Sequence, residues 1–184
     1  MNKLLVVGLV AAVSGCCTFS EPETPPNTLS EKEKAEGWQL LWDGKSSDGW
    51  VGVKTKFTKF PEKGWSMSRG VLTVLPVRGI TNGKWVDLPP EDAKLGGGGD
   101  IVTVKKYKDF EFSFDFKLTD AANSGIKYFY DETKNKATCE EYQILDKNHP
   151  DWKKGYEGNR RVAALYDLMP SNADKYLNDM DEWN

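Results

Sequence analysis

The sequence predicts an all-β fold, an antiparallel β-sandwich with a short N-terminal helix. The first observation is the stretch 110–118, where four phenylalanines and a leucine alternate without exception with polar residues. A period of two belongs to a strand that buries one face. The second is that the chain after residue 37 is made of short apolar runs separated by turn residues. Antiparallel strands of this kind, each with one polar face, favour two packed sheets.

The start of the chain is predicted to be an export signal. Lys3 precedes an apolar run at 4–13, which is too short for a permanent membrane-spanning helix. The sequence VSGC at 13–16 resembles a bacterial lipobox, in which the cysteine is acylated after cleavage. We therefore expect residues 1–15 to be a lipoprotein signal peptide and Cys16 to carry the lipid. The alternative is an ordinary secretory signal with Cys16 incidental.

This signal predicts a location in the cell envelope, with membrane contact only through the lipid anchor. Cys17 follows the lipidation site where an aspartate would favour the inner membrane. By resemblance to the Gram-negative sorting rule, the expected location is the outer membrane.

The composition of the chain indicates which kinds of ligand the protein could bind. A net charge of −3 and a pI of about 5.3 argue against a nucleic-acid surface. The three cysteines lack metal-site spacing, and Cys17 and Cys139 are too differently placed to predict a disulfide. Aromatic residues make up 12% of the chain, as is common in carbohydrate-facing β proteins. Most of these rings, Trp38, Trp42 and Trp50 included, are interpreted as core.

The elements follow in order from local signals. Residues 16–29 are polar and proline-containing, which predicts an extended tether before a domain over 30–184. Ser30 and Glu33 form a capping-box pattern, which predicts a helix over 31–35 that ends at Gly37. Strands are then expected at 39–42, 50–53, 101–104 and 140–145, with a hairpin at 66–75 around Arg69-Gly70.

The remaining segments are assigned by their turn residues and phase. Residues 80–95 show no period and are predicted to be a loop, and the glycines at 96–99 lack the Gly-Lys-Ser/Thr of a P-loop. Asn123-Ser124-Gly125 is predicted to turn the chain. A polar loop over 148–160 and a short strand at 163–166 complete the order.

Nine short motifs in sequence order resemble the 3-keto-disaccharide hydrolase domain family. They are GWQLLWDGK at 37–45, DGW at 48–50, GDIVT at 99–103, YKDFE at 107–111, NSGIKYF at 123–129, EYQILD at 141–146, GNR at 158–160, LYDL at 165–168 and EWN at 182–184. The resemblance implies a concanavalin A-like jelly roll, the lipoprotein branch of the family, and cleavage of glycosides whose sugar carries a ketone at C3. In the family EWN is followed by further strands, so those C-terminal strands are expected to be missing.

A ketone at C3 acidifies the hydrogen on C2, so a base can start an elimination that expels the C1 substituent. Glu141 is the first candidate for the base or for a metal ligand, and Lys127 for polarising the ketone oxygen. The alternative is a structural ion pair between these two residues. His149 is the third catalytic candidate, as an acid–base or metal-binding pair with Asp146. A solvated loop histidine is the alternative.

Six further residues are candidates for binding the sugar, through the polar strand face or the matched motifs: Asp115, Asn123, Gln143, Asp146, Arg160 and Tyr166. No cofactor is required by these residues, although a divalent metal ion is an alternative. The leading interpretation is an enzyme for 3-keto-glycosides. A non-catalytic carbohydrate-binding module is the second, and an inactive fragment the third. A two-carboxylate glucanase is disfavoured because no Glu-x-Asp-x-x-Glu motif occurs.

Overall fold

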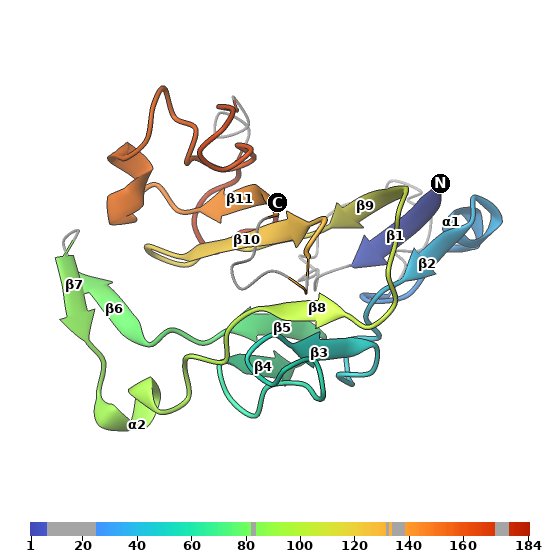
Figure 1. Ribbon diagram of the computed structural model, residues 1–184, viewed down its shortest axis with the longest axis horizontal. Helices are drawn as coiled ribbons and strands as arrows, with labels where there is room; N and C mark the ends of the chain where they lie inside the picture. The colour runs from blue at the N-terminus through green and yellow to red at the C-terminus, as the bar shows by residue number, and fades with distance from the viewer. Residues whose placement is uncertain (7–24, 82–83, 132, 134–138, 172–176) are drawn as a thin grey trace, which may run out of the picture. The chain divides into compact units, whose positions relative to one another are not determined.

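The protein is built mainly of strands, which confirms the all-β prediction (Figure 1). The computed structural model describes residues 1–6, 25–81, 84–131, 133, 139–171 and 177–184. These form two compact units, each discontinuous in sequence. Unit 1 comprises Met1–Val77 and Leu88–Phe116, and unit 2 comprises Arg78–Asp87 and Lys117–Asn184. The concanavalin A-like arrangement of the sheets stays a prediction.

A three-stranded sheet in unit 1 has the start of the chain at its centre. Strand β1 (Asn2–Val6) lies between β2 (Trp38–Leu40) and β9 (Phe110–Phe114), and it runs parallel to both (Figure 1). The first residues of the predicted export signal therefore form a strand. Within the described residues, no helix has the length and apolarity needed to cross a bilayer.

Strand β9 shows the predicted alternation. Phe110, Phe112 and Phe114 are half-buried, and the polar residues between them are exposed. The rings of Phe112 and Phe114 stack with centroids 5.1 Å apart. The strand is shorter than the predicted 110–118, because regular pairing ends at Phe114 and Lys117 forms only an isolated bridge, with Trp183 in unit 2.

The other elements of unit 1 follow their local signals. The hairpin of β4 (Trp65–Ser68) and β5 (Val71–Val74) turns at Arg69 and Gly70, whose φ angles are 53° and 73°. Both angles lie in the left-handed region that such a turn requires. The predicted capping box begins helix α1 (Glu31–Ala35), and β3 (Trp50–Gly52) pairs with β8 (Ile101–Thr103).

The prediction of a loop over 80–95 is wrong. Strands β6 (Arg78–Thr81) and β7 (Lys84–Asp87) form a hairpin that belongs to unit 2. A short helix, α2 (Pro90–Ala93), follows and belongs to unit 1. All four residues of β7 are exposed. With no buried face on this strand, nothing in the sequence imposes a period of two.

Unit 2 is organised around the antiparallel pair β10 (Asn123–Tyr128) and β11 (Glu140–Leu145). Its core contains six buried apolar residues in or near this pair: Leu118, Ala121, Ile144, Leu145, Val162 and Ala164. The predicted strand at 163–166 is reduced to a bridge between Leu165 and Tyr142. The Gln143 N–H still donates to the Ala164 carbonyl at 3.0 Å. A 3-10 helix, η1 (Pro150–Lys153), lies within the predicted 148–160 loop.

The turn predicted at Asn123-Ser124-Gly125 is also wrong, because these residues begin β10. The chain turns just before them, where Ala121 has a φ of 55° and the Ala122 N–H donates to the Thr119 carbonyl at 3.0 Å. The Ala121 N–H is held by the Asp146 carboxylate at 2.9 Å, and the Ala122 carbonyl accepts from the Asp146 N–H. A buried side chain from the end of β11 therefore fixes this turn.

Candidate functional site

Glu141 and Lys127 are directly opposite each other in the β10–β11 ladder. Opposite residues in an antiparallel pair share a face, with Cβ atoms about 4.5–5.5 Å apart. Lys127 is exposed and Glu141 is half-buried. Glu140 is paired with Tyr128 and projects to the other face of the sheet. The prediction that Glu141 and Lys127 share one face is confirmed.

The carboxylate of Glu141 lies over the backbone of Gly125. A Cβ atom built on Gly125 would be 2.1 Å from Oε1 of Glu141 and 2.8 Å from both Cγ and Cδ. Gly125 is paired with Gln143, the next residue of β11 on the same face as Glu141. The glutamate therefore leans along the sheet into space that only a glycine leaves open.

Gln143 does not line an open polar face as the alternation predicted. Its side chain is 2% exposed, and its Oε1 accepts the backbone N–H of Ile144 at 3.0 Å. The amide folds back on its own strand, where the Ala163–Ala164 backbone pairs with Gln143 on the outer edge. Asn123, by contrast, is exposed at the first position of β10, opposite Leu145.

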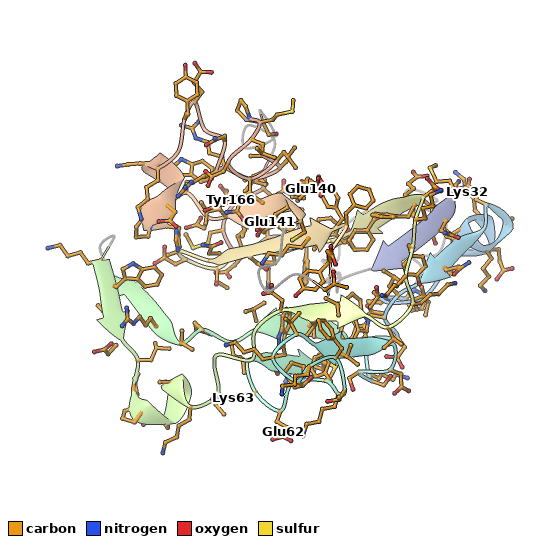
Figure 2. All side chains as sticks on the ribbon, in the orientation of Figure 1. Lys32, Glu62, Lys63, Glu140, Glu141 and Tyr166 are labelled. Carbon is orange, nitrogen blue, oxygen red and sulfur yellow. The ribbon has the colours of Figure 1, made fainter. Side chains whose placement is uncertain are left out.

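Arg160 and Tyr166 are brought together beside Glu141. Two guanidinium nitrogens of Arg160 contact the Asp167 carboxylate, Nε to Oδ1 at 2.5 Å and Nη2 to Oδ2 at 2.8 Å. The guanidinium also lies 5.2 Å from the centre of the Tyr166 ring. The Tyr166 N–H donates to the Glu141 carbonyl at 2.9 Å, and both residues are labelled beside β11 in Figure 2.

The hydrogen bond from Arg160 to Asp167 raises the pKa of the guanidinium above its usual range. Arg160 is therefore charged at pH 7. A planar cation held by a carboxylate and lying over an aromatic ring is well placed to donate to hydroxyl or carboxylate oxygens. The sequence did not single out Asp167, whose role as the partner of Arg160 becomes visible only in the structure.

Asp146 and His149 are both buried, and their side chains hold backbone groups. The Asp146 carboxylate accepts from the N–H groups of Ala121 and Asn148, at 2.9 and 3.0 Å. Nδ1 of His149 accepts from the Asp151 N–H at 3.0 Å and caps η1. The alternative of a solvated histidine is wrong, because the residue is 3% exposed. Burial is the main reason that the pKa of His149 lies below its ordinary value, so the ring is neutral at pH 7.

Trp85 on β7 packs against His149. The two ring centroids are 5.5 Å apart at an interplanar angle of 81°, an edge-to-face contact. Trp85 keeps 52% of its surface exposed. A half-exposed indole on a fixed support is a surface on which a sugar ring can stack. The sequence carries a signal that could have found this hairpin, because Asn82-Gly83 is the dipeptide typical of a two-residue hairpin loop.

Two predicted features, Asp115 and Cys16, are not among the residues described so far. Asp115 is exposed just after β9 and belongs to unit 1. Cys16 lies outside the described residues. Unit 1 also holds a cavity of about 340 Å³ beside Asp48, Lys105 and Tyr107, where burial raises the pKa of the tyrosine. None of the predicted site residues lines it.

Metal binding was an alternative for the acidic residues and His149. Across the described ranges, no three or more His, Cys, Asp or Glu side chains gather closely enough to hold a metal ion. Asp146 and His149 instead use their described side-chain contacts to hold backbone N–H groups.

Comparison with known proteins places the same segments in a known family. Residues 37–184 match the sequence profile of the 3-keto-alpha-glucoside-1,2-lyase-like domain. The chain is also 32% identical over 163 residues to a protein of Bacteroides thetaiotaomicron named 3-keto-disaccharide hydrolase. That alignment covers 82% of this chain and 51% of the relative. The chain thus spans about half the length of the curated relative that it matches.

Proposed function

Because the chain belongs to the 3-keto-alpha-glucoside-1,2-lyase-like family, we propose that it cleaves the glycosidic bond of 3-keto-glycosides. The observation that carries the proposal is the pairing of Glu141 with Lys127 across the ladder. It places one carboxylate and one ammonium on the same face of a sheet. Abstraction of a proton next to a ketone needs these two groups, a base and a cation for the oxygen that becomes negative.

In the proposed reaction, the Glu141 carboxylate takes the proton from C2, and the electrons of the C–H bond move toward the C3 oxygen. The ammonium of Lys127 stabilises the negative charge on that oxygen. The enolate then returns its electrons as the bond between C1 and the glycosidic oxygen breaks, and the departing alkoxide takes up a proton. Addition of water across the new C1–C2 double bond completes a net hydrolysis.

The neighbouring residues supply contacts to the sugar in this proposal. Arg160, held by Asp167 and lying over the Tyr166 ring, donates to oxygens of the substrate. Asn123 adds an exposed amide at the start of β10. His149 acts indirectly, since its buried ring supports Trp85, and Gln143 and Asp146 act through the backbone that they hold.

Location at the cell envelope is part of the same proposal. Residues 1–15 are removed and Cys16 is acylated, which tethers the domain to a membrane through about a dozen polar residues. Mass spectrometry of the N-terminal peptide from cells that express the full chain tests this step. The peptide should carry acyl groups on Cys16, and Cys16→Ser should abolish them.

The activity is tested with a 3-keto-glucoside and two matched variants. Glu141→Gln removes the base and should lower turnover by at least about a hundredfold, the scale of a general base. Glu140→Gln makes the same change one residue away, on the other face, and should retain parent turnover. Equal turnover by the parent and Glu141→Gln would remove Glu141 from the mechanism.

The route can be separated from direct hydrolysis by running the reaction in D₂O. Elimination followed by addition of water places deuterium at C2 of the product, whereas direct displacement at C1 leaves the C2 hydrogen in place. Product incubated without enzyme corrects for spontaneous exchange next to the ketone.

A non-catalytic carbohydrate-binding module is the second candidate, favoured by the half-exposed indole of Trp85. In that case, the 3-keto-glucoside or its parent glycoside would bind and shift tryptophan fluorescence without being cleaved. Binding with no detectable product would replace the enzymatic proposal with this one.

A further inference from the structure

Strand β1 fills a gap one strand wide in unit 1. Among the described strands, β2 and β9 each pair with β1 and with no other, in the order β2–β1–β9 (Figure 1). Neighbouring strands lie about 4.7–4.9 Å apart. Without β1, therefore, β2 and β9 would be separated by roughly twice that distance, too far for hydrogen bonds between them.

The residues in this gap belong to the segment that the proposed processing would remove. β1 covers Asn2–Val6, and the predicted cleavage falls before Cys16. Removing the segment would leave two strands, each with a bare row of backbone donors and acceptors, and such edges are strong templates for another extended chain.

We propose that the gap between β2 and β9 is a strand-acceptor site for an extended apolar peptide that runs parallel to both strands. Residues 2–6 fill the site in the unprocessed chain, and an external peptide of the same pattern fills it after processing. Backbone ladders on both sides supply affinity, as in other cases of strand addition. The inference is independent of the proposed reaction, but it rests on the proposed removal of residues 1–15 as well as on the strand pairing in unit 1.

Side chains around the gap set the register of the peptide. The Asn2 backbone N–H donates to the Asp109 carbonyl at 2.9 Å, and Nδ2 of Asn2 reaches the same oxygen at 3.2 Å. These contacts fix the first position of the bound strand. They place residue 2 opposite Phe110 and residue 6 opposite Phe114.

The place taken by Lys3, the second residue of β1, selects a cation. Lys3 is opposite Glu111 on β9, and its Nζ is 3.9 Å from the Glu36 carboxylate. The same ammonium lies 5.5 Å from the centre of the Trp38 ring. Two carboxylates and an indole face therefore surround this place, and a negative side chain would be repelled. The site should prefer a lysine or arginine followed by apolar residues.

The test uses the processed chain, residues 16–184, and a synthetic peptide of residues 1–7, MNKLLVV. We expect saturable binding that raises the unfolding midpoint and changes the fluorescence near Trp38. A peptide with Lys3→Glu should bind several-fold more weakly, and Glu111→Lys in the protein should recover part of that loss. A peptide with Leu4→Pro should not bind, because proline cannot donate to a ladder from the middle of a strand.

Absence of saturable binding by a folded processed chain would overturn the proposal. So would equal binding of MNKLLVV and its Leu4→Pro variant, since the contact would then not be a strand ladder. If residues 16–184 do not fold alone, the same ladder is tested in the full chain. There, Leu4→Pro should lower the unfolding midpoint clearly more than Leu4→Ala, which shortens the same side chain but keeps the backbone N–H. Equal midpoints for the two full-chain variants would overturn the proposal as well.

Discussion

The carboxylate of Glu141 occupies the volume that a side chain on Gly125 would need, with Oε1 2.1 Å from the place of a Cβ atom. Gly125 and Glu141 lie on adjacent strands, two ladder positions apart on the same face. The position of the proposed base therefore depends on the absence of a methyl group across the sheet.

Gly125→Ala should displace the Glu141 side chain and reduce kcat by tenfold or more. Overpacking of this kind costs about 1–3 kcal/mol of stability, so urea unfolding should be measured alongside turnover. In a Glu141→Gln background the same alanine should add little further loss, because two changes that act through one group are not additive. Full additivity of the two losses would show that Gly125 acts elsewhere. Ser124→Ala, one residue earlier on the opposite face, serves as the control.

The buried ring of His149 predicts how stability depends on pH. Burial lowers the pKa of His149 in the folded protein, whereas the unfolded chain titrates near 6.5. Below that pH the unfolded state binds more protons than the folded state, so the free energy of unfolding falls as pH drops from about 6.5 toward the lowered pKa.

His149→Asn keeps an acceptor for the Asp151 N–H but removes the titrating group. Urea unfolding at pH 7.5 and 5.5 should therefore show a smaller loss of stability on acidification in His149→Asn than in the parent. Lys147→Gln, a change at an exposed neighbour, should keep the parent's pH dependence. Equal pH dependence in the His149 variant and the parent would contradict the assignment.

Arg160→Lys should weaken substrate binding more than it slows chemistry. Lysine keeps the charge but loses the two-pronged contact with Asp167 and the planar group over the Tyr166 ring. We expect KM for a 3-keto-glucoside to rise several-fold while kcat changes little. Asp167→Asn releases the same guanidinium from the other side and should give a similar rise. An unchanged KM in both variants would exclude Arg160 from the substrate contacts.

The capping box of α1 predicts a purely structural effect. Ser30 Oγ accepts the Glu33 N–H at 3.2 Å, and Glu33 accepts the Ser30 N–H at 2.7 Å. Ser30→Ala should cost about 0.5–2 kcal/mol of unfolding free energy, the usual cost of losing an N-cap. Ser30→Asp keeps an acceptor and should cost less. Chemical denaturation of the three proteins makes the comparison, and equal stability of parent and alanine variant would contradict the prediction.

The sequence predicted those elements whose signals are local. The alternation in β9, the Arg69-Gly70 turn and the capping box of α1 are each determined by residues a few positions apart. The common face of Glu141 and Lys127 also followed from strand phase alone, because side chains alternate with a period of two.

Features set by distant segments were not predictable in this way. The burial of Gln143 depends on packing at its own strand and on the Ala163–Ala164 backbone. The burial of His149 depends on Trp85, which lies 64 positions earlier in the chain. No periodicity encodes such contacts. The turn was misplaced for the same reason, since the Asp146 carboxylate holds it at Ala121 from the far end of β11.

The chain crosses between the two units three times, after Val77, Asp87 and Phe116. Neither unit is therefore an uninterrupted stretch that a ribosome could deliver whole. The β6–β7 hairpin emerges early, but His149, on which Trp85 packs, follows about sixty residues later. Synthesis from the N-terminus thus leaves that indole without its packing partner until most of the polypeptide has been made.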